Sequence, residues 1–349
     1  MRILINVPKL SNPGGVSVLY NVLKIQDRYD NVKLFQIHSK LPSFLGFIKK
    51  YIEFFSLVKL FDIIQLNPSL NKKSFFRDSI YAYIAKLAKK KLVVYWHGWE
   101  NDYEEAIFKS KFLKWIFKKT FAKADLSIVL GQVFSDKLKN LGFQNRIIIE
   151  TNAVESRFLS FPLKKRVINQ DDEIKLLFIA RLQKEKGVYE AIETLKLLNK
   201  EQKNKYKLII AGSGNEEEKI AALANNDDSI DFLGYIRDED KHKALLNSDI
   251  LFFPTYYPEG LPLTILEGIM YGLPVISRPV GGISDIIIHE RNGFIIESKD
   301  AKDFANVIKR LSSDNNLYSK ISENNIEKSS MFMPSSVCER LMGYYNSIV

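Results

Sequence analysis

The stretch FFPTYYPEGLPLTILEGIMYGLPVISRPVGG, from Phe252 to Gly282, decides the fold of this chain and indicates its chemistry. It reads as an apolar strand, a loop, a helical pattern and a second apolar strand that leads to a double glycine. Two carboxylates, Glu259 and Glu267, lie in this otherwise apolar segment. A plain core helix avoids glycine and proline and keeps its charges on the solvent side. The stretch therefore predicts a strand–loop–helix unit that offers acceptors and bare backbone to a ligand.

Length and composition indicate a globular protein of two ordinary domains. The chain has 349 residues, of which 46% are hydrophobic and 26% are charged, enough to bury two separate cores. Its one cysteine, Cys338, cannot form an intramolecular disulfide, so we expect a reducing compartment and no cysteine-ligated metal. The N-terminal run lacks the apolar region of a signal peptide, and no run reaches transmembrane length. We therefore expect a cytoplasmic protein.

Positive charge is concentrated in the first half. Residues 1–160 contain 26 Lys and Arg against 13 Asp and Glu, a net charge of +13, whereas residues 161–349 contain 25 against 28, a net charge of −3. This asymmetry indicates an anionic partner for the first half: a membrane surface, nucleic acid or an acidic ligand. The alternative is that the lysines only keep the surface soluble. No recognisable nucleic-acid-binding module occurs, so nucleic acid is not expected as a partner.

Continuous apolar runs alternate with helical patterns through the first half. Runs that are apolar throughout, rather than at every second residue, are typical of parallel strands covered on both faces. The predicted strands are Ile3–Val7, Val32–Ile37, Ile63–Asn67, Leu92–His97, Leu126–Leu130 and Ile147–Glu150. Helical patterns between them include Val16–Lys24 and Ser79–Lys90.

The polar stretch SFPLKKRVINQDDE, residues 160–173, is predicted to be a linker, after which the alternation restarts. The predicted strands are Lys175–Ala180, Lys207–Ala211, Ile230–Phe232, Ile250–Pro254 and Pro274–Ser277, and the predicted helices are Tyr189–Asn199, Glu216–Leu223, Asp238–Leu246 and Leu263–Tyr271. Two such arrays predict an α/β protein with two doubly wound, Rossmann-like domains that face each other. In such sheets ligands bind beyond the carboxyl ends of the strands.

Two loops of the first half suit a ligand. NPGGVS follows the first predicted strand, and its Gly14 and Gly15 open a helix; paired glycines let backbone N–H groups approach an anion there. WHGWEN follows the fourth strand and places His97 at the strand end, before Gly98. Simple turn glycines and a hydrogen-bonded structural histidine are the alternative interpretations.

The loops of the second half are more specific. IARLQKEKG places Arg181 and Lys186 just beyond a strand, where two cations can neutralise a diphosphate without a metal ion. LIIAGSGN gives a glycine loop with Gly212 and Gly214, and FLGYI places Gly234 at another strand end. A tight turn is the alternative for these glycines.

The two carboxylates of the opening stretch suit a hydroxyl-rich ligand. A carboxylate accepts paired hydrogen bonds from vicinal hydroxyls, as in ribose or hexose diols. Glu259 lies in the loop and Glu267 within the following helix, so the pair can grip two ends of an extended polar ligand. The backbone of Gly260, Leu261, Pro262 and Leu263, at the helix start, is expected to offer amides to a phosphate or a hydroxyl. A metal pair is the rival interpretation, but no nearby His or Asp completes a coordination set.

These motifs together resemble a known family. ARLQKEKG, AGSGN, FLG, EGLPLTILE with its E-x7-E pattern, and GLPVISRPVGGISDII are similar, in order and spacing, to retaining glycosyltransferases of family 4, which have the GT-B fold. The likeness extends through about residues 175–310. The first half resembles the family more thinly, through PGGVS, HG and TNAVESRF.

The resemblance implies a nucleotide-sugar donor in a cleft between the domains, and no metal ion or cofactor. Arg181 and Lys186 would hold the donor diphosphate, with Gly14 and Gly15 closing over it. Glu267 would bind the ribose hydroxyls. The transferred sugar would meet Glu259, with residues 260–263 beside it. Gly212, Gly214 and Gly234 would also bind the donor, and the choice of base would depend on the loops near Gly212 and Gly234. The implied catalytic residues are His97, Glu259, Arg181 and Lys186, and transfer would proceed with retention.

The resemblance also implies the domain plan. We expect an acceptor-side domain at 1–160, a nucleotide-sugar-binding domain at 161–333, and a last helix at 334–349 that returns to the first domain. The expected function is sugar transfer to a glycan or lipid-linked acceptor in cell-envelope polysaccharide or lipopolysaccharide synthesis. A GT-B enzyme acting on a soluble acceptor and a non-catalytic nucleotide-sugar-binding subunit remain alternatives.

Two segments of the first half suit an anionic membrane. In KSKFLKWIFKKTFAK a helical wheel places Phe112, Leu113, Ile116 and Phe117 on one face, Lys111, Lys114 and Lys118 opposite, and Trp115 and Phe121 at the flanks. FLGFIKKYIEFFSLVKLF combines many aromatic residues with scattered lysines. Lysines beside aromatic residues suit an anionic lipid surface, so we expect peripheral binding to the inner face of the cytoplasmic membrane. The alternative is that both segments pack on the sheet.

Overall fold

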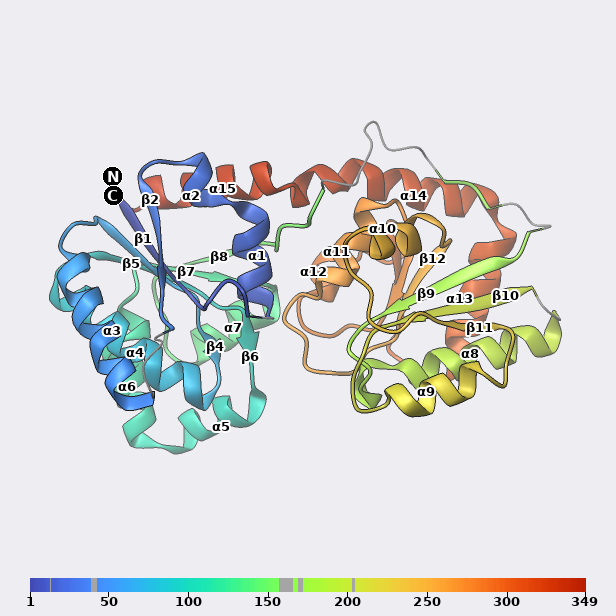
Figure 1. The fold of residues 1–349 in the computed structure, drawn as a ribbon, viewed down its shortest axis with the longest axis horizontal. Coiled ribbons are helices and arrows are strands. Elements are labelled where there is room, and N and C mark those ends of the chain that lie inside the picture. Colours follow the sequence, from blue (N-terminus) through green and yellow to red (C-terminus); the bar gives the residue numbers. More distant parts are fainter. Residues whose placement is uncertain (13, 39–42, 157–165, 169–171, 203–204) are drawn as a thin grey trace. The chain divides into compact units, whose positions relative to one another are not determined.

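The chain consists of two compact units. This computed structural model describes all residues except 13, 39–42, 157–165, 169–171 and 203–204, and the side chains of 43–45 are also left undescribed. Unit 1 comprises Met1–Ala153 and Pro334–Val349, and unit 2 comprises Val154–Met333 (Figure 1). Each unit has a parallel sheet flanked by helices, as predicted from the two βα arrays. Most of the linker expected at 160–173 lies outside the described residues.

Unit 1 contains a six-stranded sheet in the order β2-β1-β3-β5-β7-β8. Its strands are β1 (Ile3–Val7), β2 (Val32–Gln36), β3 (Ile63–Leu66), β5 (Lys91–Tyr95), β7 (Leu126–Val129) and β8 (Arg146–Ile149). Every pairing is parallel; Ile5, for example, pairs with Leu34 on one side and Gln65 on the other. A second, two-stranded sheet joins β4 (Ser69–Leu70) and β6 (Gly98–Trp99).

The helices of unit 1 are α1 (Gly15–Leu23), α2 (Ile25–Arg28), α3 (Ser43–Val58), α4 (Lys72–Leu87), α5 (Asn101–Lys109), α6 (Lys111–Lys119), α7 (Gln132–Asn140) and α15 (Pro334–Asn346), with a short 3₁₀ helix η1 (Phe121–Lys123). The prediction that a helix begins at residue 79 was wrong. α4 begins at Lys72 because the Asn71 side chain accepts a hydrogen bond from the Ser74 amide at 2.9 Å and so caps the helix.

The orientation of α6 also differs from the prediction. Phe112, expected on the core face, is 61% exposed, whereas Phe121, expected at a flank, is buried. Phe117 supplies the buried contact, and it packs on Phe121 with ring centroids 6.2 Å apart. The helix has nine residues, and its exposed face combines four lysines with two aromatic side chains, Phe112 and Trp115.

The terminal helix α15 packs within unit 1. It contacts α1, and its Arg340 donates from Nε and Nη2 to the two carboxylate oxygens of Glu150, at 2.9 and 2.7 Å. The Tyr344 hydroxyl donates to Glu150 as well, at 2.8 Å. Because Glu150 is buried at the end of β8, these bonds satisfy its charge and fix the helix to the sheet.

Unit 2 repeats the architecture with the order β11-β10-β9-β12-β13-β14, and all its pairings are parallel. Its strands are β9 (Ile174–Ile179), β10 (Tyr206–Ala211), β11 (Ile230–Phe232), β12 (Ile250–Phe253), β13 (Val275–Ser277) and β14 (Gly293–Ile295). Its helices are α8 (Val188–Glu201), α9 (Glu217–Ala224), α10 (Asp238–Leu246), α11 (Leu263–Met270), α12 (Ile283–Ile286), α13 (Ala301–Ser313) and α14 (Asn315–Ser329), with 3₁₀ helices η2 (Lys184–Lys186) and η3 (Ser330–Phe332).

Arg166 fixes the described part of the linker to unit 2. Its guanidinium donates to the carbonyl oxygens of Leu245 and Leu246, both at 2.9 Å, and to that of Ser248. Its Nε donates to the Tyr271 carbonyl at 2.8 Å. Carbonyl groups at the end of a helix lack partners within the helix, so Arg166 stabilises the end of α10.

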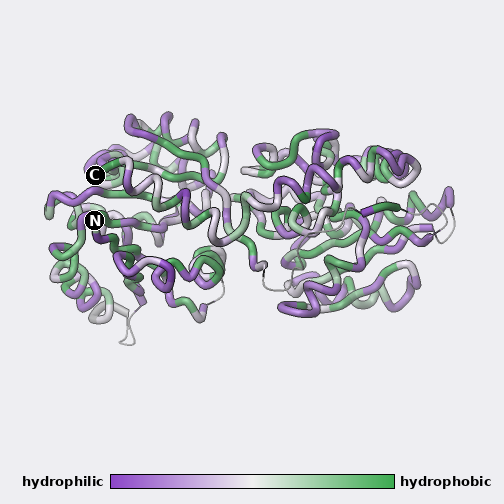
Figure 2. The backbone as a smooth tube through the Cα atoms, turned by 90° about the horizontal axis from the view of Figure 1, so that it is seen from above, coloured by the Kyte–Doolittle hydropathy of each residue, from purple (hydrophilic) through white to green (hydrophobic). Residues whose placement is uncertain are grey.

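The predicted strands of both halves are confirmed to within two residues at each end. Their side chains form the cores, since the central strands are almost wholly buried, and Figure 2 shows hydrophobic and hydrophilic stretches alternating along both units. In each sheet the chain first builds outward on one side of its first strand and then continues on the other side. This change of direction falls between β1 and β3 in unit 1, and between β9 and β12 in unit 2.

Candidate active site

The carboxyl ends of β9 and β12 bring the polar residues of unit 2 together. These strands are neighbours in the sheet although β10 and β11 lie between them along the chain. Arg181 and Lys186 follow β9, and Thr255, Tyr257 and Glu259 follow β12. Ligands of doubly wound sheets bind where the strand order changes direction, beyond the carboxyl ends. The residues predicted from the two loops therefore lie at the position where the fold favours a binding site.

Lys186 and Glu259 form a buried ion pair. Lys186 Nζ lies 2.5 Å from Glu259 Oε1, and Thr255 Oγ1 donates to the same oxygen at 3.1 Å. Lys186 is only 6% exposed, and this burial lowers the pKa of its ammonium group although Glu259 opposes the shift. Among the described residues no hydrogen bond reaches Glu259 Oε2. That oxygen remains an acceptor beside a fixed positive charge.

The ring of Tyr257 lies against both cations. Lys186 Nζ is 4.1 Å from the ring centroid and Arg181 Cζ is 5.7 Å from it. A cation over an aromatic face is attracted by the ring quadrupole. Sequence reasoning missed Tyr257 and Thr255, although both lie in the loop that the opening stretch singles out. Arg181 itself is exposed, so its guanidinium is accessible to a ligand.

Glu267 is paired with a residue that sequence reasoning did not identify. Glu267 on α11 is 8% exposed, and its Oε1 lies 2.5 Å from Nζ of Lys241 on α10. No hydrogen bond to Glu267 Oε2 occurs within the described part of the chain. Nothing in the sequence marks Lys241, because the pair joins two helices that only the fold brings together. The carboxylate is thus held in place by one oxygen and presents the other.

Close packing between loops requires glycine at positions 212 and 214. A Cβ at Gly212, where φ is +146°, would lie 1.8 Å from the Ala180 carbonyl oxygen, and one at Gly214 would lie 2.4 Å from that of Leu182. Gly212 N donates to the Gly234 oxygen at 2.8 Å. These contacts bring the loops after β9, β10 and β11 together at one edge. Their role in ligand binding stays a prediction.

The double glycine of the opening stretch supports the loop that carries Glu259. Gly281 has φ +56°, and a Cβ there would lie 2.0 Å from the Glu259 carbonyl oxygen. Gly282 N donates to the Gly260 carbonyl at 2.7 Å. A larger residue at 281 would displace the loop that carries Glu259. The double glycine therefore fixes the backbone from which the Glu259 side chain extends.

Pro262 interrupts the row of backbone N–H groups at the start of α11. Pro262 precedes the helix as its N-cap residue, and proline has no N–H group. Of the four residues Gly260, Leu261, Pro262 and Leu263, only three therefore carry an amide hydrogen. The role of this segment in donor binding stays a prediction.

In unit 1 the predicted glycines lie at the start of α1. Gly14 is the N-cap residue of this helix, which begins at Gly15, and the Gly14 carbonyl accepts from Val18 N at 3.0 Å. A Cβ built on either glycine would meet no atom of the described residues within 4 Å. The backbone here is open, as an anion-binding helix start requires, and the role of the two glycines in donor binding stays a prediction.

His97 lies just beyond β5, held in one orientation. Its Nε2 is 2.9 Å from Asn67 Oδ1, its backbone N donates to the Pro68 carbonyl at 3.0 Å, and its ring packs on Tyr95 with centroids 4.1 Å apart. Asn67 Nδ2 donates to the Asn6 carbonyl at 2.6 Å, so Oδ1 faces His97 and accepts from Nε2–H. Burial lowers the pKa of His97 to about 3. The imidazole is therefore neutral near pH 7, with Nδ1 as an acceptor.

No three His, Cys, Asp or Glu side chains gather closely enough to hold a metal ion among the residues described. Within the same residues, no helix combines the length and the apolar character needed to cross a bilayer.

Comparisons with known proteins agree with this architecture. Residues 161–328 match the model of the family described as glycosyl transferases group 1. The chain is 29% identical over 321 residues to an uncharacterised glycosyltransferase, MJ1069 of Methanocaldococcus jannaschii, in an alignment that covers 85% of this chain and 79% of that protein. It is 26% identical over 263 residues to the amylovoran biosynthesis glycosyltransferase AmsK of Erwinia amylovora, covering 69% of this chain and 63% of AmsK.

A solved structure matches the whole chain. Anabaena HepE, crystallised in complex with UDP, superposes with a TM-score of 0.75 at 16% identity, over 99% of this chain and all of HepE. The chain has the GT-B glycosyltransferase fold. The two Rossmann-like domains of GT-B are units 1 and 2, and the residues that match the family model all lie in unit 2. The likeness to HepE thus shows the fold, and the family match is confined to unit 2.

Proposed function

We propose that this protein is a retaining glycosyltransferase that moves a sugar from a nucleoside-diphosphate donor to a lipid-linked or polysaccharide acceptor in cell-envelope glycan synthesis. The observation that carries the proposal is the group formed by Arg181, Lys186, Glu259 and Glu267 at the carboxyl edge of the unit 2 sheet. Two cations and two carboxylates match the two halves of such a donor, an anionic diphosphate and hydroxyl-rich sugars.

The diphosphate lies against the cations. Arg181 offers a guanidinium fork to phosphate oxygens, and Lys186 is a point charge that Glu259 and the Tyr257 ring hold in place. As the bond to the transferred sugar breaks, negative charge grows on the leaving diphosphate. Positive charge already fixed in a partly dry site stabilises that change without reorganisation. A metal ion is not needed for this step.

The carboxylates bind the sugars. Glu259 uses Oε2 for hydroxyls of the transferred sugar and Glu267 uses Oε2 for the ribose hydroxyls, while Lys186 and Lys241 occupy the other oxygens. Hydrogen bonds to a charged acceptor stabilise by about 1.5–3 kcal/mol each. UDP in the HepE crystal structure and the amylovoran role of AmsK support a nucleotide-linked donor and a polysaccharide product.

His97 is assigned to the acceptor hydroxyl. Its neutral ring offers Nδ1 as an acceptor, and Asn67 keeps the ring from turning. Transfer then proceeds by displacement on the front face of the donor sugar, which retains the configuration. The residue orients the incoming hydroxyl, and the leaving diphosphate receives the proton.

Unit 1 has a surface that fits a membrane. The helices α3, α4 and α6 are neighbours, because α4 contacts both of the others. Each of the three exposes apolar side chains to solvent. We call these side chains the aromatic helix surface: Ile48, Ile52 and Phe55 of α3, Phe76, Ile80, Tyr83 and Leu87 of α4, and Phe112 and Trp115 of α6. The α4 set recurs every three or four residues and so lies along one face of the helix. A soluble surface rarely carries such stripes unless they bind something.

Charge indicates which partner covers this surface. Lys59 Nζ lies 5.5 Å from the Phe55 ring centroid and Lys114 Nζ lies 5.9 Å from that of Phe108. Lys111 and Lys118 are exposed on α6. Aromatic side chains interleaved with lysines match the interface of an anionic bilayer. We assign the aromatic helix surface to the inner face of the cytoplasmic membrane, where a lipid-linked acceptor is found.

A donor screen tests the proposed function. The chain is incubated with UDP-, GDP-, dTDP- and ADP-sugars, and both nucleotide release and calorimetric binding are measured. One nucleotide class should bind, and its sugar should be released slowly to water; Glu259→Gln should abolish release. Glu193→Gln, an exposed glutamate on α8, is the matched control and should behave like the parent. If no nucleotide sugar binds or is cleaved, the proposal is wrong.

A glycosyltransferase for a soluble acceptor is the second candidate. Such an enzyme would use the same donor site and would not bind a membrane through the aromatic helix surface. Equal activity with and without anionic vesicles, on an acceptor that has no lipid, would favour it.

A further inference from the structure

Unit 1 contains a cavity of about 160 Å³ that the donor chemistry does not use. Its described lining comes from the carboxyl ends of β1, β2 and β3, from β4, and from the first two turns of α1 and α4. β1 and β3 are the neighbouring strands between which the order of the first sheet changes direction. The cavity thus occupies the position in unit 1 where a doubly wound sheet favours a ligand.

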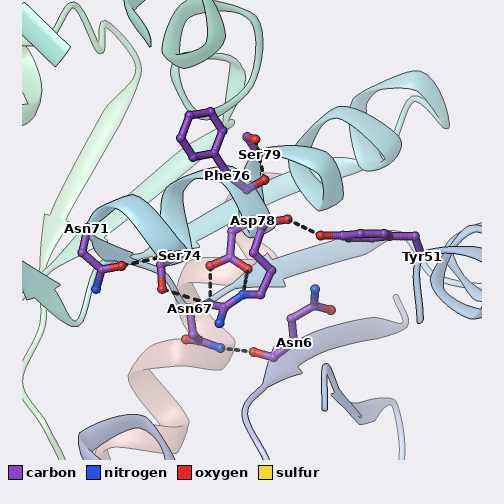
Figure 3. A network of polar contacts seen from close by, with 9 residues as sticks. Asn6, Tyr51, Asn67, Asn71, Ser74, Phe76, Asp78 and Ser79 are labelled. Carbon is purple, nitrogen blue, oxygen red and sulfur yellow. Dashed lines mark hydrogen bonds and ion pairs between the residues drawn. The ribbon is translucent and has the colours of Figure 1, made fainter. Parts of the chain in front are cut away.

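Asn6 is the residue of this cavity whose bonding is incomplete. It lies in β1 and is 2% exposed, and neither the oxygen nor the nitrogen of its side-chain amide has a hydrogen-bond partner among the described residues. Nearly all buried amide groups are hydrogen-bonded in proteins, so an exception needs a reason. Figure 3 shows this amide beside the polar network of α4, with no contact drawn to it. A bound polar group would complete its bonding.

Arg77 and Asp78 supply the charged wall of the cavity. Arg77 donates from Nε to Asp78 Oδ1 at 2.9 Å and from Nη2 to Oδ2 at 2.6 Å, and Nη2 also reaches Ser74 Oγ at 3.1 Å (Figure 3). Asp78 is 2% exposed. Burial raises the pKa of Asp78 while Arg77 opposes the shift. The two charges cancel, and among the described residues no other ionisable side chain lines the cavity.

We propose that this cavity binds one neutral sugar ring. A sugar hydroxyl both donates and accepts, and the free amide of Asn6 offers one acceptor and one donor of the same kind. Pro8, Val16 and Ile37 form an apolar wall that suits the C–H face of a ring. A phosphate or carboxylate would lie near the Asp78 carboxylate and would find no net positive charge. The volume is below the ~300 Å³ at which sites for larger ligands begin, so it holds one ring rather than a chain.

On the proposed function, this ring belongs to the acceptor. Asn67 lines the cavity and also accepts the hydrogen bond from His97 Nε2. One side chain therefore connects the cavity with the residue assigned to the acceptor hydroxyl. The cavity would select acceptors whose terminal sugar is uncharged, and sugar acids and sugar phosphates would be excluded.

Saturation-transfer NMR on the full chain tests this inference. The neutral probes are the methyl α-glycosides of glucose, galactose and N-acetylglucosamine, and the anionic probes are glucuronate and glucose 1-phosphate. The part of the transfer that Asn6→Ala removes should reach at least one neutral probe and neither anionic probe. Asn6→Ala should weaken that binding about tenfold or more, since two hydrogen bonds are lost. Its thermal midpoint should not fall, because the Asn6 amide bonds to no described residue.

Two further variants separate the alternatives. Val16→Phe, which fills the cavity from its apolar wall, should reduce transfer at least as strongly as Asn6→Ala, whereas Glu193→Gln, an exposed site on α8 of unit 2, should leave it unchanged. Absence of transfer from every neutral probe, which would mean a bound water only, overturns the inference. Equal transfer from the neutral probes in the parent and in Asn6→Ala also overturns it. So does binding of an anionic probe that Asn6→Ala weakens. Calorimetry with nucleotide on the same samples reports on the donor site, so its failure counts against the proposed function and not against the cavity.

Discussion

Lys186 Nζ and Glu259 Oε1 lie 2.5 Å apart, although the two residues come from loops that follow different strands. The pair joins the loop after β9 to the loop after β12 across the point where the strand order changes direction. Both side chains are almost fully withdrawn from water. The cation proposed for the donor diphosphate and the carboxylate proposed for its sugar therefore fix each other's position before any ligand arrives.

Breaking this pair on one side should cost stability. Glu259→Leu leaves a buried ammonium without a partner and Lys186→Met leaves a buried carboxylate, and we expect each to lower the free energy of unfolding by about 3 kcal/mol. The double variant removes both charges, so it should recover most of the loss while remaining inactive. Urea unfolding of the parent, both single variants and the double variant measures this. Additive losses in the double variant would show that the two side chains are not coupled.

Glu267 should be needed for nucleotide binding, and Lys241 should not. Glu267→Gln removes the charged acceptor assigned to the ribose, which should weaken nucleotide binding roughly 10- to 150-fold. Lys241→Met keeps the carboxylate and should change the affinity by less than about threefold, since it removes only the orienting partner. Isothermal calorimetry with the nucleotide found in the donor screen compares them. Unchanged affinity in Glu267→Gln would reject the ribose assignment.

Sugar transfer should survive removal of divalent metals. Arg181 and Lys186 supply the positive charge proposed for the leaving diphosphate, so EDTA should leave the initial rate within about twofold. The rate is measured after dialysis against EDTA and again after adding Mg²⁺ or Mn²⁺. Loss of activity that a divalent ion restores would contradict the metal-independent mechanism.

The aromatic helix surface should bind anionic vesicles through both its charges and its rings. Lys111→Glu, Lys114→Glu and Lys118→Glu together should reduce vesicle binding more than 100-fold, at about 1 kcal/mol for each lysine. Phe112→Ser with Trp115→Ser should weaken binding without changing its salt dependence. These side chains are exposed, so folding should be affected little, within about 0.5 kcal/mol per site.

The control for the vesicle experiment is a triple variant of unit 2 in which three lysines are also replaced by glutamate. Lys196, Lys200 and Lys302 are exposed on helices of unit 2, and their replacement by glutamate should leave vesicle binding near that of the parent. Co-sedimentation with vesicles measures all variants at two salt concentrations, because salt screens the lysine contribution. If both triple variants lose binding equally, net charge and not this surface is responsible.

The stability of the protein should fall in mild acid because of His97. Its pKa in the folded protein is about 3, below the ordinary value of about 6.5, so the unfolded chain binds a proton more readily. Stability is then fully present above pH 6.5 and is lost as the pH falls from 6.5 towards 3. At pH 5 the loss should be about 2 kcal/mol. Urea unfolding at pH 7 and pH 5 should show this difference in the parent and not in His97→Gln.

Much of the fold could be predicted because it is encoded locally. A buried parallel strand must be apolar along its whole length, and β1, β11 and α10 begin and end at the residues that the sequence predicts. The loops proposed to bind the donor are also predictable, since in this class of fold they follow strands. Arg181, Lys186 and Glu259 lie in such loops, and Glu267 lies on the helix that follows one of them. The error at α4 arose where a polar cap, Asn71, rather than an apolar period, sets the helix start.

The sequence by itself thus determined the two βα arrays, the loops that carry chemistry and the charge of each half, because period and composition are local properties. Only the tertiary structure decided which strands are neighbours, and with that the pairing of Lys186 with Glu259 and of Lys241 with Glu267. It also decided that Phe112 faces solvent and that Asn6 has a bare amide beside a cavity. These features depend on contacts between segments far apart in the chain, whose geometry follows from packing the whole sheet and from no single window of sequence.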